Sequence, residues 1–248
     1  MSGFIIMNKR SYKRGSRYGC RILSGPLACL LAALLLVSMG VVAHDISGAN
    51  ARFMEGLDGP AVLPYLYLGA KHMVTGYDHL LYLLGVVFFL HRLKDIILYV
   101  SLFTLGHSMT LMLGVLAELS VNASLVDMVI GLSVAYKAFE NINGFKAVFG
   151  LKLDARIAVL IFGLFHGLGL ATKLQDLSLS KDSLVVNMLS FNLGVEVGQA
   201  LALVCVVGVL GCWRQRDSFK RHAFMANTVL MGLGFMLAGF QFAAYLWG

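Results

Sequence analysis

The chain has 248 residues, of which 58% are hydrophobic and only 13% are charged, and its mean hydropathy is +0.79. A soluble domain carries roughly 25% charged residues, so a soluble globular enzyme is close to excluded, and disorder is excluded because it requires low hydrophobicity. The net charge of +7 does not indicate a surface that binds nucleic acid, because from residue 44 onward the chain has 14 basic and 13 acidic residues, which nearly balance. The composition predicts an all-α fold, a polytopic membrane helix bundle without a nucleic-acid partner.

The first 43 residues have the pattern of a targeting segment. Six basic residues precede an apolar run at 22–42, and Val41-Val42-Ala43 fits the small-residue site at which a signal peptide is cleaved. An uncleaved signal anchor is the alternative. The predicted organisation is a signal segment at 1–43, followed by one transmembrane domain at 44–248.

Six apolar stretches follow, each near the roughly 20 residues that a helix needs to cross a bilayer. None of them alternates with a period of two, which argues against a barrel. The predicted transmembrane helices cover 63–90, 96–116, 124–143, 156–174, 184–213 and 224–247.

Lysine and arginine residues set the predicted orientation, because they concentrate in cytoplasmic loops. If residue 44 lies outside, the inner loops contain nine basic residues and the outer segments contain three. We therefore expect a multi-pass protein of the bacterial inner (cytoplasmic) membrane whose mature N- and C-termini are both periplasmic.

The first predicted span contains His72, Asp78 and His79 within eight residues. In a straight helix the two histidines would lie ~10.5 Å apart along the axis, too far for one metal ion with bonds of ~2.1 Å. Gly76 lies between them, and a helix break there would bring both toward one point. Asp78 would supply an oxygen ligand or orient an imidazole. A hydrogen-bonded cluster without an ion is the alternative.

Other predicted spans also carry polar residues. Insertion of a charged side chain at the bilayer centre costs roughly 2.5–3.5 kcal/mol, so these residues are expected to have partners. His107 in the second span and His166 in the fourth are candidate metal ligands, and Glu196 in the fifth is a candidate ligand or proton carrier. The alternatives are interhelical hydrogen bonding for His107 and a carbonyl bond for His166, with the flanking G-x-x-x-G glycines serving close packing. Lys137 and Glu140, three residues apart in the third span, are predicted to form a structural ion pair.

The pattern His72-x5-Asp78-His79, followed later by Phe165-His166-Gly167, resembles the HupE/UreJ family of membrane proteins. The resemblance extends over nearly all of the mature chain. These are small polytopic proteins associated with hydrogenase and urease systems, and the family is linked to nickel uptake. The resemblance implies that His72, Asp78, His79 and His166 handle metal, with Glu196 as a further position.

The second motif departs from the nickel-linked branch, which tends to read F-H-G-x-A/V-H-G-x-E. Here Leu170 stands at the second histidine position and Lys173 at the glutamate position. The chain therefore resembles a divergent branch of the family. Nickel is the substrate that the resemblance favours, although imidazole ligands also suit zinc and copper.

These observations predict a secondary transporter or permease for a divalent transition-metal ion, working inward across the inner membrane, and not an enzyme. No G-x-x-x-x-G-K-[ST] P-loop is present, so ATP hydrolysis within the chain is not expected. The candidate metal ligands are His72, Asp78, His79, His107, His166 and Glu196. The expected partners are the metal ion, the lipid bilayer and a metalloenzyme or its maturation proteins.

Two other functions use the same residue types. An intramembrane metal-dependent hydrolase would hold its metal with histidine and aspartate and activate a water molecule. A non-transporting assembly partner of a metalloenzyme would bind the metal without moving it. Uptake of a metal by the protein in liposomes separates transport from both alternatives.

Overall fold

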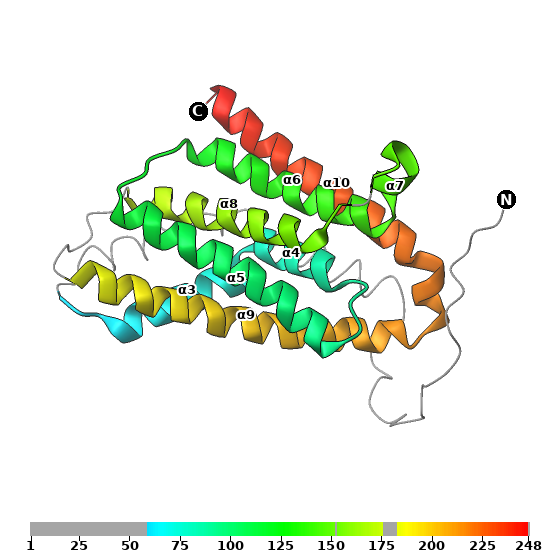
Figure 1. The fold of residues 1–248 in the computed structure, drawn as a ribbon, viewed down its shortest axis with the longest axis horizontal. Helices are drawn as coiled ribbons and strands as arrows, with labels where there is room; N and C mark the ends of the chain where they lie inside the picture. The colour runs from blue at the N-terminus through cyan, green and yellow to red at the C-terminus, as the bar shows by residue number, and fades with distance from the viewer. Residues whose placement is uncertain (1–58, 152, 176–182, 248) are drawn as a thin grey trace.

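The computed structural model describes residues 59–151, 153–175 and 183–247, and within these ranges the regular elements are helices. Figure 1 shows the long helices lying side by side along the length of the molecule. In chain order they are α3 (Val62–Thr75), α4 (Tyr77–Val87), α5 (Leu93–Leu116), α6 (Ala123–Asn141), α7 (Gly144–Phe149), α8 (Ala155–Gln175), α9 (Leu184–Arg214) and α10 (Asp217–Trp247). The all-α prediction is confirmed for these residues, whereas the predicted signal segment at 1–43 lies outside them.

Four helices, α5, α8, α9 and α10, are long and apolar enough to cross a bilayer. They leave many large apolar side chains exposed, for example Leu201, Val204 and Met236. Such faces are unfavourable in water and suit contact with lipid tails. The chain is therefore a multi-pass membrane protein.

The other two predicted spans differ from a continuous apolar helix. The first is divided into α3 and α4, which are 14 and 11 residues long. The third corresponds to α6, which is 19 residues long and carries Asp127, Lys137 and Glu140. The predicted ion pair between Lys137 and Glu140 is present at 2.9 Å. Asp127 forms a second pair, with Lys173 of α8 at 2.7 Å, which was not predicted. Length and composition thus support four crossings, and the count of six stays a prediction.

Close backbone contact joins three pairs of helices, α3 with α9, α5 with α8, and α6 with α10. Glycines make this approach possible. A side chain at Gly194 would run into the carbonyl oxygen of Leu66, and one at Gly167 into the carbonyl oxygen of His107. Small residues have this role in membranes because lipid provides no hydrophobic force to press helices together. The predicted packing role of the glycines around His166 is confirmed.

The helix α4 lies at the centre of the bundle. Eight of its eleven residues are buried, and it contacts α3, α5, α6, α9 and α10. It begins at the predicted break, where Gly76 has φ −69° and ψ 102° and donates its N–H to the carbonyl oxygen of His72 at 2.9 Å. Because a helix requires a ψ near −42°, this residue ends α3 and lets α4 start in a new direction.

Candidate metal centre

The break at Gly76 brings two histidines of the first predicted span together. The ring centroids of His72 and His79 lie 4.9 Å apart, whereas a straight helix would hold them about 10.5 Å apart along its axis. The absence of a side chain at Gly76 also leaves room for the pair formed by His79 and Asp78. A Cβ atom on Gly76 would lie 2.7 Å from Nδ1 of His79 and 3.0 Å from Oδ1 of Asp78.

Asp78 orients the ring of His79. Its Oδ1 lies 3.0 Å from Nδ1 of His79, and both residues are buried. An ionised carboxylate can only accept, so the ring proton lies on Nδ1 and Nε2 keeps its lone pair. That nitrogen makes no hydrogen bond to any described residue. A carboxylate behind a histidine in this way is the usual support for a metal ligand.

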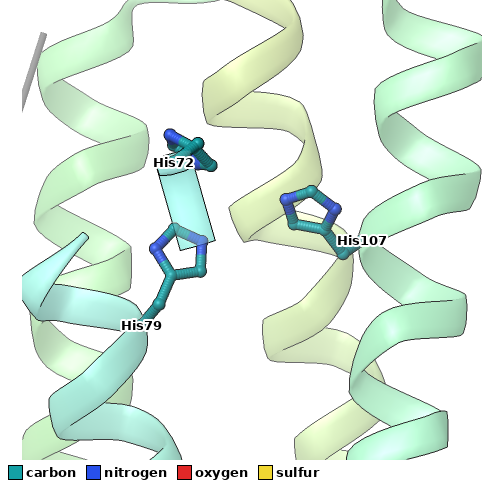
Figure 2. A group of neighbouring side chains, drawn as sticks. All are labelled: His72, His79 and His107. Atoms are coloured by element: carbon teal, nitrogen blue, oxygen red, sulfur yellow. The ribbon is translucent and has the colours of Figure 1, made fainter. Parts of the chain in front are cut away.

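His107 is the most deeply buried member of the cluster, with a relative exposure of 0%. Neither of its ring nitrogens has a hydrogen-bond partner within the described ranges. A buried polar group left without a partner costs about 1–3 kcal/mol, so the fold is expected to keep this ring for a ligand. Figure 2 shows His107 on α5 facing the two rings at the break, and the centroids of His107 and His79 lie 6.0 Å apart.

His166 joins the cluster from α8. Its Nδ1 donates to the carbonyl oxygen of Phe162 at 2.7 Å, which fixes the plane of the ring. Its ring centroid lies 5.1 Å from that of His79. The carbonyl bond and the approach to the other histidines, which the sequence presented as alternatives, therefore occur together.

The cluster contains two overlapping groups of three residues. Within each group, the ligand atoms all lie within 4.8 Å of one another. The His72 trio consists of His72, His79 and His107, and the His166 trio consists of Asp78, His79 and His166. Ligand atoms around a tetrahedral ion with bonds of ~2.1 Å lie about 3.4 Å apart, so shifts of the order of an ångström would close either trio. His79 belongs to both.

The family model described as HupE / UreJ protein matches residues 49–247 of the chain. The chain belongs to the HupE/UreJ family. A search of the curated proteins and a search of the solved structures each found no match. The matched range contains both trios, so the HupE/UreJ assignment and the cluster rest on the same part of the sequence.

Glu196 is the one candidate ligand that this HupE/UreJ chain does not bring to the cluster. Its side chain is exposed on α9, and it belongs to neither trio. The middle of the buried face of α9 is formed by Phe191, Val195 and Gly198, and each residue turns a helix by about 100°. Glu196 follows Val195 directly and so points away from that face. The structure therefore does not bring Glu196 to the cluster, and its role as a ligand or proton carrier stays a prediction.

Two buried polar groups near the cluster were missed in the sequence. Tyr82 lies three residues after His79, one turn further along α4, and is 2% exposed. Gln199 of α9 is 2% exposed, and its Oε1 is hydrogen-bonded to the hydroxyl of Thr104 on α5. The signal for Tyr82 was its i+3 spacing from a candidate ligand. Gln199 and Glu196 are both polar residues within the same predicted span. The sequence alone does not show which of the two faces inward.

Proposed function

We propose that this HupE/UreJ chain is a secondary transporter that moves a divalent transition-metal ion across the membrane. The observation that carries the proposal is the buried cluster of four imidazoles and one carboxylate. In it, Nε2 of His79 and both ring nitrogens of His107 make no hydrogen bond to the described residues. Neutral imidazole is a strong ligand for nickel, copper and zinc. The link of the family to nickel uptake makes Ni²⁺ the first substrate to test.

The two trios are proposed as successive positions of one ion. His72 is partly exposed, whereas the other three histidines of the cluster are buried. The ion would therefore enter at the His72 trio. Exchanging His72 and His107 for Asp78 and His166 then moves it to the second trio while His79 stays bound, and in this step the carboxylate of Asp78 leaves Nδ1 of His79 and turns to the ion. A shared ligand keeps the ion coordinated during the step, and the carboxylate offsets part of its charge.

The membrane potential is proposed to drive entry in the bacterial inner membrane, with the mature termini in the periplasm. An inside-negative potential favours cation entry by ~2.3 kcal/mol per charge per 100 mV, which is about 4.6 kcal/mol for a divalent ion. Three protein ligands leave a fourth coordination position open, as in sites that exchange their ligand, and unlike closed structural zinc sites. Such a site can release the ion after binding it.

Uptake of Ni²⁺ into proteoliposomes tests the proposal. A potential negative inside is imposed, and a fluorescent indicator in the lumen reports the ion. We expect saturable uptake that His79→Ala abolishes. The matched control is His222→Ala, because His222 lies on α10, outside both trios, and bonds the carbonyl oxygen of Ser218.

The same experiment separates the alternative functions. Wild-type protein that binds Ni²⁺ with no uptake at any potential would overturn transport and favour an assembly partner. Uptake that His79→Ala leaves unchanged would overturn the role of the cluster.

A further inference from the structure

A small cavity of about 10 Å³ adjoins the cluster. This is close to the smallest space that holds one water molecule. It lies among α4, α5 and α9, beside the shared ligand His79. The residues that matter in its wall are His79, Tyr82, Val86, Val100 and Gln199.

Three residues of the wall carry polar groups with hydrogen-bonding capacity to spare. The hydroxyl of Tyr82 and Nε2 of His79 are buried and make no hydrogen bond to any residue that the structure describes. The side chain of Gln199 uses its Oε1 for Thr104, which leaves its amide nitrogen as a donor. A buried water needs two to four polar partners, and three residues of this wall carry such groups.

We propose that the cavity binds one water molecule, and that this water becomes the exchangeable ligand of the metal ion held at His79. The inference rests on the proposed function, because it concerns how the transported ion is bound and released. Each trio supplies three ligands, which leaves a position open for water. The cavity is a space lined by the shared ligand His79 in which a water fits.

Tyr82 suits both states of this water because a phenol both donates and accepts. In the metal-free state the water donates to Nε2 of His79 and accepts from Tyr82 and Gln199. When the ion occupies Nε2, the water turns its oxygen to the ion, and Tyr82 accepts one of its hydrogens. Removal of the Tyr82 hydroxyl should therefore weaken the hold on water without removing a metal ligand.

The water can be detected directly with Cu²⁺, a paramagnetic probe that histidine ligands bind well. The full-length protein is loaded with Cu²⁺ in detergent, exchanged into D₂O and examined by deuterium electron spin-echo envelope modulation. We expect the strong modulation of a directly bound water in the wild type. Val86→Ile, which fills the cavity and keeps every polar group, should lose it. Val100→Leu is a second filling variant, and Val204→Ile on the exposed face of α9 is the matched control.

Transport rate and affinity provide the second measurement. We expect Val86→Ile and Tyr82→Phe to lower the rate of Ni²⁺ uptake about tenfold, within the range that outer-shell changes cause, and to change the Kd for Ni²⁺ less than about twofold. Full modulation in both filling variants would overturn the water site. A Kd that rises tenfold or more in Tyr82→Phe would also overturn it, by making Tyr82 itself a ligand.

The two measurements separate this inference from the transport proposal. Suppose that the wild type gives strong deuterium modulation, that the filling variants abolish it, and that the protein takes up no Ni²⁺. This result would support the water site and overturn transport. A chain that binds neither Cu²⁺ nor Ni²⁺ would overturn both.

Discussion

The two ends of α4 adjoin two buried polar clusters that differ in one respect. The histidine cluster lies at its beginning and comprises the two trios. The asparagine cluster lies at its end, where Asn141 of α6 donates to the carbonyl oxygen of Gly85 at 2.8 Å and to Oδ1 of Asn227 at 2.9 Å. Asn227 in turn donates to the carbonyl oxygen of Ala223. The asparagine side chains find their hydrogen-bond partners within the protein. His79 and His107, by contrast, have ring nitrogens that make no hydrogen bond to any described residue.

This difference separates a structural polar group from a ligand site. Both clusters are buried in a bundle whose helices face lipid, so polarity within a span does not by itself indicate function. A satisfied network joins helices and fixes their register. A buried polar group without a partner weakens the fold unless a ligand binds to it, and this is why we propose the histidine cluster as the ligand site.

The largest expected effect is the loss of the shared ligand. His79→Ala removes a ligand from both trios, so the Kd for Ni²⁺ should rise beyond the roughly 10–100-fold that loss of an outer-shell partner causes. His72→Ala and His166→Ala each leave one trio intact and should each raise the Kd about tenfold. Equilibrium dialysis in detergent measures all three. Equal effects of the three substitutions would contradict a shared position for His79.

The second prediction compares the stability of the two clusters without metal. His107→Leu replaces two unsatisfied ring nitrogens with apolar atoms, so the metal-free protein should unfold at the same temperature or a higher one. Asn227→Leu leaves one of the two N–H groups of the Asn141 amide without its acceptor and should lower the free energy of unfolding by about 1–3 kcal/mol. Thermal unfolding in detergent, with chelator present, measures both. Strong destabilisation by His107→Leu would show that this ring has a structural role after all.

Much of the histidine cluster could be predicted from the sequence, because metal geometry restricts the arrangement. Two histidines seven residues apart cannot share an ion in a straight helix, and Gly76 was the residue able to break it. His107 and His166 could be added because both lie near the middle of their spans. These arguments concern depth in the membrane, which the sequence indicates well.

Rotation and helix pairing could not be predicted in the same way. The depth of Glu196 resembles that of the histidines, but the side chain points outward because α9 packs on α3 through Gly194. The ion pair between Asp127 and Lys173 joins residues 46 positions apart, and it depends on α6 and α8 being neighbours. No spacing within one helix indicates which helices lie side by side.

The third prediction concerns the helix break. Gly76→Ala introduces a Cβ that meets Nδ1 of His79 at 2.7 Å and Oδ1 of Asp78 at 3.0 Å. The φ of −69° suits alanine, so the fold should persist while the pair is pushed aside, and the Kd for Ni²⁺ should rise about tenfold. Gly208→Ala is the control, because nothing lies within 4 Å of a Cβ there. Unchanged affinity in Gly76→Ala would mean that the position of this pair does not limit binding.

The smallest expected effect is that of Glu196→Gln. Glu196 makes no hydrogen bond or ion pair with the described residues and lies outside both trios. Its substitution by the isosteric amide should therefore change the Kd for Ni²⁺ by less than a factor of about two, whereas Asp78→Asn should raise it about tenfold by replacing the charged acceptor behind His79 with a neutral one. Both Kd values come from the same dialysis measurement, and the pair compares two carboxylates in one bundle. A large loss of affinity in Glu196→Gln would restore Glu196 as a ligand and would require α9 to rotate. If uptake fell while affinity stayed constant, Glu196 would instead act in a later step, such as carrying a proton from the lipid-facing side of α9.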